Sequence, residues 1–179
     1  MKDSKFMKCA IITDQHFGAR KGSKIFHDYF EKFYNDIFFP VLEKENIKCV
    51  IDMGDTFDNR KSIDFWSLEW AKKNYYDKLQ LLGIKVYTVI GNHTTYYKNT
   101  NSLNSIETLL SEYENVIPIS EPGDIDIGNL SCLMIPWINS DNYETSMKRI
   151  NSSSSTVAMG HLELNGFSAY KGHIHESGM

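Results

Sequence analysis

Short apolar segments alternate with longer amphipathic segments along the first two thirds of the chain. The apolar segments have the length and the Val and Ile content of buried strands. They are residues 8–13, 48–53 and 85–90. The segments that follow them carry apolar side chains at helical spacing and predict helices over residues 25–46, 64–82 and 103–113.

The boundaries of these helices carry their own signals. In the first helix, Ile25, Tyr29, Phe33 and Ile37 recur at helical spacing, and Pro40 is expected to kink it or to end a turn. Asp64 is an expected N-cap for the second helix, and Gly83 is expected to end it. The first half therefore predicts a β-α-β-α-β-α order, which is typical of a parallel sheet with crossover helices.

The second half is richer in strands joined by short turns. Strands are predicted over residues 116–119, 124–127, 130–138 and 156–159, with a helix over 141–150. The pair Gly128-Asn129 suits a tight hairpin turn. We expect one α/β domain over residues 1–179, with a parallel first sheet and a second sheet that begins with a hairpin.

Composition excludes several classes of protein. The 179 residues are 41% hydrophobic and 23% charged, which excludes a disordered chain. The net charge of −4 excludes a passive basic surface for nucleic acid. Neither an apolar run of membrane-spanning length nor a signal peptide is found, so a cytoplasmic protein is expected. Cys9, Cys49 and Cys132 stand alone in apolar runs, which favours reduced buried thiols over a disulfide or a zinc site.

Four predicted strands each lead directly into residues that can bind metal ions. The first precedes Asp14-Gln15-His16, the second Gly54-Asp55, the third Gly91-Asn92-His93, and a later one Gly160-His161. Open α/β sheets place ligands beyond the carboxyl ends of their strands, so these side chains are expected to meet in one cleft. Each motif alone would more often be an ordinary turn or cap, but four in this order at four strand ends are an improbable coincidence.

The residue types indicate the kind of metal. Carboxylate and amide oxygens mixed with imidazole suit Mn²⁺, Fe²⁺ or Zn²⁺ rather than a thiolate site. The two oxygens of Asp55 could bridge two ions about 3.5–4 Å apart, an arrangement that activates a water for attack on phosphorus. Two divalent ions would also exceed the charge of Asp14 and Asp55 and attract a phosphodiester to an acidic protein.

The motifs D-x-H, G-D-x-x-D, G-N-H and a later G-H resemble those of the calcineurin-like metallophosphoesterase superfamily. The segments GDTFDNRKSI, IGNHTTYYKN, MIPW and GHLELNGFSAYKG look like the nuclease subunits of phage T4-type recombination complexes, which are related to bacterial SbcD. This resemblance covers nearly the whole chain. It implies a four-layer α/β/β/α sandwich whose second sheet is incomplete here.

The resemblance also implies a role for each motif residue. Asp14 and His16 match ligands of the first ion, Asp55 matches the bridging ligand, and Asn92 and His161 match ligands of the second ion. His93 matches the catalytic histidine that contacts the scissile phosphate, and Asp58 matches a residue that steadies the loop and an imidazole. The resemblance implies two divalent ions, with manganese the usual one.

The sequence departs from the family pattern in two places. Thr94 stands where an acidic residue usually orients the catalytic histidine. The final G-H-x-H motif, which supplies one ligand to each ion, normally lies well beyond the fourth motif. Residues 172–175 spell it, but no apolar strand precedes them, so His173 and His175 are not expected to be the true ligands. We therefore expect a C-terminally truncated family member.

The expected function is a divalent-metal DNA nuclease subunit of a recombination or double-strand-break processing complex. The resemblance implies DNA as substrate, an SbcC-type ATPase as partner, a homodimer, and the host cytoplasm if the gene is phage-encoded. One alternative is a metallophosphoesterase acting on phosphoproteins or nucleotides, although Asn59-Arg60 and Thr94 depart from the phosphoprotein phosphatase pattern. The other is an inactive fragment that only binds the partner ATPase.

Overall fold

A four-stranded parallel sheet forms the centre of the molecule. The computed structural model describes residues 7–170 and 172–174. The strands β1 (Ala10–Ile12), β2 (Cys49–Asp52), β3 (Lys85–Val89) and β4 (Val116–Ile119) lie in chain order and are all parallel. Crossovers of one hand between strands in chain order put their helices on the same face of the sheet. The predicted α/β fold with a parallel first sheet is confirmed.

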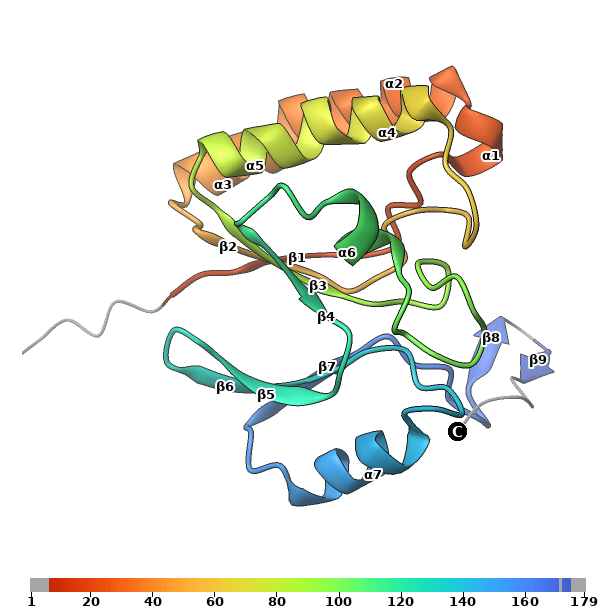
Figure 1. The fold of residues 1–179 in the computed structure, drawn as a ribbon. Helices are drawn as coiled ribbons and strands as arrows, with labels where there is room; N and C mark the ends of the chain where they lie inside the picture. Colours follow the sequence, from red (N-terminus) through yellow and green to blue (C-terminus); the bar gives the residue numbers. More distant parts are fainter. Residues whose placement is uncertain (1–6, 171, 175–179) are drawn as a thin grey trace, which may run out of the picture.

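Two long helical rods cover one face of this sheet (Figure 1). The first consists of α2 (Lys24–Phe33), the π-helical turn η1 (Tyr34–Phe38) and α3 (Phe39–Lys44). The second consists of α4 (Phe65–Ala71), the π-helical turn η2 (Lys72–Tyr76) and α5 (Asp77–Leu81). Asp64 is the N-cap of α4, as predicted, and accepts a hydrogen bond from the backbone N–H of Ser67.

Pro40 does not end the first rod. It lies in the first turn of α3, directly after η1, and the helix continues to Lys44. Proline cannot donate to the carbonyl four residues earlier, and its ring crowds that carbonyl. The wider π-helical turn, which ends two residues before Pro40, accommodates both effects within an otherwise continuous helix.

The apolar residues that predicted the first rod lie on its outer surface. Tyr29 is 72% exposed and Ile37 is 55% exposed, whereas Tyr34 and Leu42 are 1% exposed. The helix prediction is therefore right, but the row that packs against the sheet is shifted by one residue. The exposed row is Ile25, Tyr29, Phe33, Ile37 and Val41, and the core-facing row is Phe30, Tyr34, Phe38 and Leu42.

A second sheet lies against the other face of the first (Figure 1). Its strands β5 (Gly123–Ile127) and β6 (Leu130–Ile135) form the predicted antiparallel hairpin around Gly128-Asn129. Strand β7 (Val157–Gly160) runs parallel to β6 and is reached through α7 (Tyr143–Ser152), which lies on the outer side of this sheet.

Three small elements complete the described part of the chain. They are α1 (Ala19–Gly22), α6 (Ser105–Leu109), and a hairpin of β8 (Ser168–Tyr170) with β9 (His173–Ile174). The β8–β9 hairpin is a separate sheet and pairs with neither of the two larger ones.

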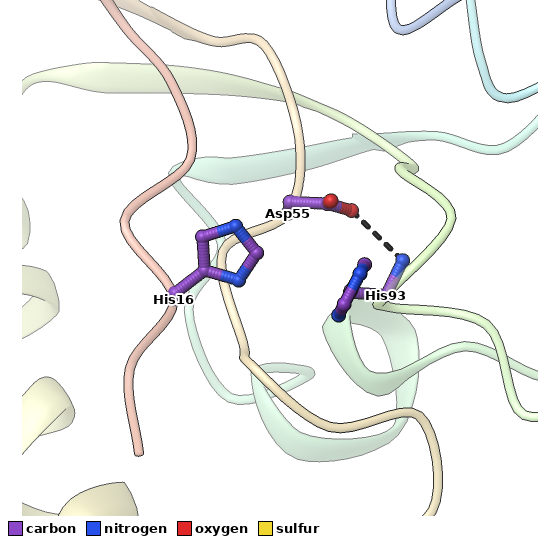
Figure 2. Close-up of side chains that lie close together, drawn as sticks. All are labelled: His16, Asp55 and His93. Atoms are coloured by element: carbon purple, nitrogen blue, oxygen red, sulfur yellow. Dashed lines mark hydrogen bonds between the residues drawn. The ribbon is translucent and has the colours of Figure 1, made fainter. Parts of the chain in front are cut away.

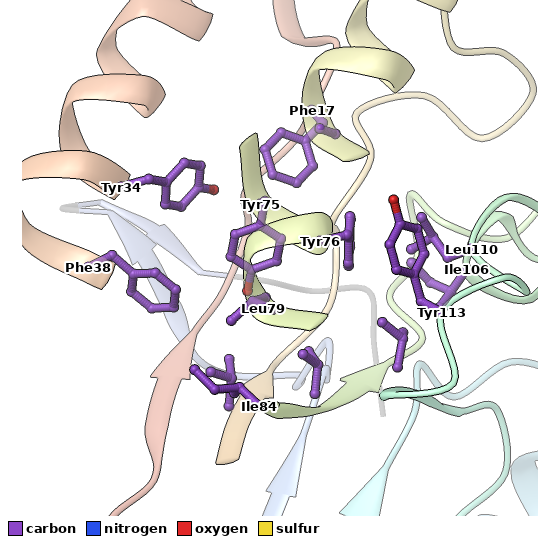
Figure 3. Close-up of a cluster of buried hydrophobic side chains, with 14 of the residues drawn as sticks. Phe17, Tyr34, Phe38, Tyr75, Tyr76, Leu79, Ile84, Ile106, Leu110 and Tyr113 are labelled. Carbon is purple, nitrogen blue, oxygen red and sulfur yellow. The ribbon is translucent and has the colours of Figure 1, made fainter. Parts of the chain in front are cut away.

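Each face of the parallel sheet has its own buried cluster. Aromatic side chains dominate the cluster between the helical rods and the sheet, with Tyr34, Tyr75 and Tyr76 at its centre (Figure 3). The cluster between the two sheets includes Cys49 and Cys132, and all three cysteines are free thiols, as predicted. In the part of the chain that the structure describes, no helix has the length and apolarity that crossing a bilayer requires.

Candidate metal centre

The loops that follow β1 and β2 run side by side beyond the end of the sheet. The backbone N–H of Asp14 donates to the carbonyl of Gly54 at 3.0 Å, and that of His16 donates to the carbonyl of Asp55 at 3.0 Å. One residue further, Phe17 donates to Thr56 at 2.8 Å, and Phe17 and Phe57 form a parallel bridge. This ladder brings the first two motifs together with a fixed register.

Three of the predicted ligands have a left-handed backbone. The φ angles of Asp14, His16 and Asp55 are 53°, 46° and 51°. Non-glycine residues adopt this region at an energetic cost, and such residues concentrate at functional sites. The conformation turns each side chain out of the ladder and toward the space beyond the strand ends. Arg20, Lys21 and Asn46 adopt the same region, so three of the six left-handed non-glycine residues in the described part of the chain are predicted ligands.

Two glycines allow the remaining loops to approach Asp55. A Cβ on Gly91 would lie 2.2 Å from Oδ1 of Asp55, and one on Gly54 would lie 2.7 Å from Nδ1 of His161. Any side chain at either position would fill the space that these two groups use. The second and third motifs therefore need glycine at positions 54 and 91, because a larger residue would clash with His161 or Asp55.

The carboxylate of Asp55 lies at the centre of the site. Its Oδ1 accepts a hydrogen bond of 2.8 Å from the backbone N–H of His93, and its Oδ2 lies 3.5 Å from Nε2 of His161 (Figure 2 draws the first bond). Burial raises the pKa of Asp55, but the hydrogen bonds from His161 and His93 outweigh it and hold the pKa below its usual value. The pocket therefore favours the ionised carboxylate.

Asn92 and His161 approach each other on one side of Asp55. Nε2 of His161 lies 3.0 Å from Oδ1 of Asn92, while Nδ1 lies 2.9 Å from the carbonyl of Met53. Burial lowers the pKa of His161, but the Asp55 carboxylate outweighs it and raises the pKa. A backbone carbonyl at Nδ1 fixes the ring orientation and directs Nε2 toward Asn92 and Asp55, as expected of a metal-binding histidine.

His16 and His93 also lie close to Asp55 (Figure 2). Their ring centroids are 5.1 Å apart, and one ligand atom from each of His16, Asp55 and His93 lies within 4.8 Å of the other two. Nδ1 of His16 lies 3.4 Å from Oδ1 of Asp58, and its Nε2 lies 3.7 Å from Oδ1 of Asp14. Asp58 therefore lies beside the imidazole of His16.

The imidazole of His93 is held by a backbone group. Its Nδ1 lies 2.6 Å from the carbonyl oxygen of Asp58, to which it donates when it carries the proton. Thr94, at the position of the usual acidic residue, is buried and donates its hydroxyl proton to the carbonyl of Gly91 at 2.8 Å. The absence of an acid at Thr94 therefore does not leave His93 without an orienting partner.

The predicted residues fit a site for divalent cations. Asp14, His16, Asp55, Asn92, His93 and His161 converge from four strand ends. They offer two carboxylates, an amide oxygen and imidazole nitrogens, a donor set that suits Mn²⁺, Fe²⁺ or Zn²⁺. The buried Nδ1 of His16 has no hydrogen-bond partner among the described residues. His175 and the side chain of His173 lie outside what the structure describes.

Several residues around the site were not predicted. Asp52 is completely buried at the end of β2 and accepts hydrogen bonds from Gln15 and Thr56, both at 2.9 Å. An acidic residue inside an apolar strand was the available signal. Glu163 accepts a long hydrogen bond of 3.4 Å from the side-chain amide of Asn92. Its signal was only its position two residues after His161.

Comparison with known proteins finds one matching family and similar nucleases. A family profile described as calcineurin-like phosphoesterase matches residues 7–176. Exonuclease subunit 1 of Enterobacteria phage T4 is 36% identical over 169 residues, which are 93% of this chain and 48% of that protein. This chain therefore spans about half the length of that relative. The crystal structure of the Pseudomonas putida nuclease MPE superposes with a TM-score of 0.43 and 13% identity, covering 72% of this chain and 60% of that one.

Proposed function

Because the chain belongs to the calcineurin-like phosphoesterase family, we propose that it is a divalent-metal-dependent DNA nuclease subunit. The four-layer sandwich with an incomplete second sheet, expected from the sequence, is the architecture that this proposal assumes. Asp14, His16, Asp55, Asn92 and His161 would hold two metal ions, with manganese the expected metal. His93 would be the catalytic residue, and Asp58 would support His16.

One observation supports this proposal above the others. Ligand atoms of Asp55 and His16 lie within 4.8 Å of each other, and Oδ2 of Asp55 lies 3.5 Å from Nε2 of His161, so Asp55 is near candidate ligands of both ions. A carboxylate between two groups of ligands is the arrangement that a bridging role requires. Members of this family typically bind divalent metals, and the left-handed backbone of Asp55 serves this placement of its side chain.

The residues of the chain divide the chemistry among them. When bound, a pair of divalent ions supplies Lewis acidity and lowers the pKa of a water that attacks phosphorus. Asp14, Asp55 and the neighbouring candidate ligands would hold those ions. His93 donates from Nδ1 to the Asp58 carbonyl, and its Nε2 would contact the phosphate. To protonate the leaving oxygen from Nε2, the ring would have to carry a proton on both nitrogens and would become neutral in that step.

The partners in this proposal come from the relative. That relative is named an exonuclease subunit, which implies assembly with at least one other component. We extend this to DNA as substrate, an SbcC-type ATPase as partner, a homodimer, a role in recombination or double-strand-break processing, and the host cytoplasm as location. The share of the relative that this chain spans makes each of these a matter for experiment.

The test is cleavage by the purified chain with and without Mn²⁺. We expect Mn²⁺-dependent hydrolysis of bis(p-nitrophenyl) phosphate and cleavage of linear duplex DNA. Preference for p-nitrophenyl phosphate, a monoester, would instead favour a phosphatase of proteins or nucleotides. Binding to an SbcC-type ATPase without any Mn²⁺ binding or hydrolysis would favour the inactive partner-binding fragment.

A further inference from the structure

A carboxylate lies in the aromatic cluster behind the candidate metal centre. Residues of a strand alternate between its faces, so Val50 and Asp52 share the face that packs against the helical rods, while Cys49 and Ile51 face the second sheet. Asp52 is 0% exposed, and burial of a carboxylate is costly unless hydrogen bonds compensate it. Its position therefore calls for an explanation.

The carboxylate of Asp52 holds both ligand-bearing loops. Its Oδ2 accepts hydrogen bonds from the side chains of Gln15 and Thr56, and its Oδ1 accepts one of 3.1 Å from the backbone N–H of Gly54. Gln15 lies between Asp14 and His16 in the first loop. Gly54 and Thr56 flank Asp55 in the second loop. The one carboxylate thus reaches the immediate neighbours of three candidate ligands.

The side chain of Gln15 is in turn hydrogen-bonded to a residue of the first helical rod. The hydroxyl of Tyr34 donates to Oε1 of Gln15, and both side chains are buried. Tyr34 belongs to the π-helical turn η1. Its hydroxyl fixes which end of the Gln15 amide faces Asp52, because an amide that accepts at Oε1 presents its Nε2 donors elsewhere.

We propose that Asp52 is a positioning residue, which sets the spacing between the Asp14–His16 loop and the Asp55 loop through Gln15 and Thr56. The proposal rests on the proposed function, in that the two loops carry the metal ligands. The hydrogen bonds of Asp52 go to neighbours of the candidate ligands and not to the ligands themselves. Groups that hold ligands from behind typically change metal affinity 10- to 100-fold when removed.

Thr56→Val tests the link with little change of shape, and Thr88→Val is its matched control. Thr88 is equally buried, lies opposite Asp52 in the register of β2 with β3, and its hydroxyl has no partner among the described residues. Both variants exchange a buried hydroxyl for a methyl group. Only Thr56→Val removes a donor to Asp52.

Two readouts apply to the folded variants. The first is hydrogen exchange of the metal-free protein at the amides of Asp14, His16 and Phe17, which form the ladder between the loops. We expect exchange about tenfold faster in Thr56→Val and Asp52→Asn, and unchanged in Thr88→Val. The second is Mn²⁺ affinity, followed by the electron paramagnetic resonance signal of free Mn²⁺. We expect it to fall about 10- to 100-fold in the same two variants.

A polarity swap separates positioning from simple loss of stability. In the double variant with Asp52→Asn and Gln15→Glu, the amide at position 52 donates to the carboxylate at position 15, and the total charge is unchanged. We expect it to recover most of the Mn²⁺ affinity lost in Asp52→Asn. A double variant that binds no more tightly than Asp52→Asn would overturn the proposal.

The remaining outcomes are also decisive. Mn²⁺ affinity and loop exchange in Thr56→Val that match Thr88→Val would overturn the proposal while leaving the proposed function intact. A parent chain that binds no Mn²⁺ would refute the proposed function instead. In that case hydrogen exchange at Asp14 and His16 still decides whether Asp52 holds the two loops together.

Discussion

The ring of His93 is hydrogen-bonded to the backbone of Asp58, with Nδ1 2.6 Å from the carbonyl oxygen. This contact joins the third motif to the second and assigns the proton of the neutral ring to Nδ1. Nε2 would donate to a phosphate oxygen when the ring carries a second proton there. The position after His93, where the family usually has an acid, can therefore be a threonine without loss of the ring's orientation.

We predict that His93→Ala reduces hydrolysis without abolishing metal binding. General acid–base catalysis contributes about 10²–10⁴-fold, so kcat for bis(p-nitrophenyl) phosphate should fall by about that factor. Mn²⁺ affinity, measured by titration calorimetry, should change less than about threefold. Loss of Mn²⁺ binding together with activity would show that His93 is a ligand, as its distance to His16 and Asp55 also permits.

Asp55→Asn should remove the stabilisation that metal binding gives. At a Mn²⁺ concentration of about 100 times Kd, binding stabilises a folded protein by about 2.7 kcal/mol. For a chain of this length that corresponds to about 5–10 °C in Tm. We expect this shift in the parent and in Asp36→Asn, an exposed control. We expect no shift in Asp55→Asn, which can still accept the hydrogen bond from the N–H of His93. An unchanged Mn²⁺ shift in Asp55→Asn would contradict the bridging role.

Asp52 should make the metal-free protein less stable as the pH rises. Burial raises its pKa to about 7, although hydrogen bonds from Gly54, Thr56 and Gln15 oppose the shift. A carboxyl whose pKa is raised on folding stabilises the protein fully below its unfolded pKa of about 3.9, and that contribution is lost as the pH rises through 7.

Urea unfolding of the parent and of Asp52→Asn between pH 4 and pH 8 measures this contribution. From pH 4 to pH 8, the unfolding free energy of the parent should fall by a few kcal/mol relative to that of Asp52→Asn. The pKa of His161 is also raised in the folded protein, but this applies to both proteins and cancels in the difference. A pH-independent difference would show that Asp52 keeps an ordinary pKa.

Gly91→Ala should disrupt the site, whereas Gly123→Ala should not. The added methyl group at position 91 would lie 2.2 Å from Oδ1 of Asp55 and 2.6 Å from its backbone nitrogen. Overpacking of this kind costs about 1–3 kcal/mol and would displace the carboxylate. At Gly123 no atom lies within 4 Å of the added carbon. Mn²⁺ titration and urea unfolding of both variants measure the contrast, and equal behaviour would contradict the steric argument.

The outer row of the first helical rod should tolerate substitution. Tyr29→Lys replaces a side chain that is 72% exposed and should change the unfolding free energy by less than about 0.5 kcal/mol. Leu42→Ala, in the core-facing row, should cost about 2–5 kcal/mol. Urea unfolding measures both. A large loss for Tyr29→Lys would mean that the outer row packs against something in the folded protein.

The sequence predicted most of the fold because its strands are short apolar runs that end at glycine or at polar residues. Asp14, Asp55, Asn92 and His161 stand directly after such runs, and the edge of a parallel sheet brings them together. The positions where the strands end could therefore be predicted from the sequence without knowing how the helices pack on the sheet.

Two features could not be predicted in this way. Neighbouring rows of the first rod are both apolar, so the spacing of Ile25, Tyr29, Phe33 and Ile37 could not decide which row faces the sheet. The π-helical turns also depend on tertiary packing rather than on periodicity. The role of Asp52 depends on Gln15 and Thr56, which meet it only when the two loops are aligned.

The ladder from Asp14 to Phe17 has a consequence for how this centre can change. Its two segments behave as a single unit, since an insertion in either would slide every rung after it and point the side chains elsewhere. Insertions and deletions between the two segments are therefore expected within residues 18–48, which connect the first segment to β2. Anyone grafting this centre onto another parallel sheet would have to transplant both segments as one piece.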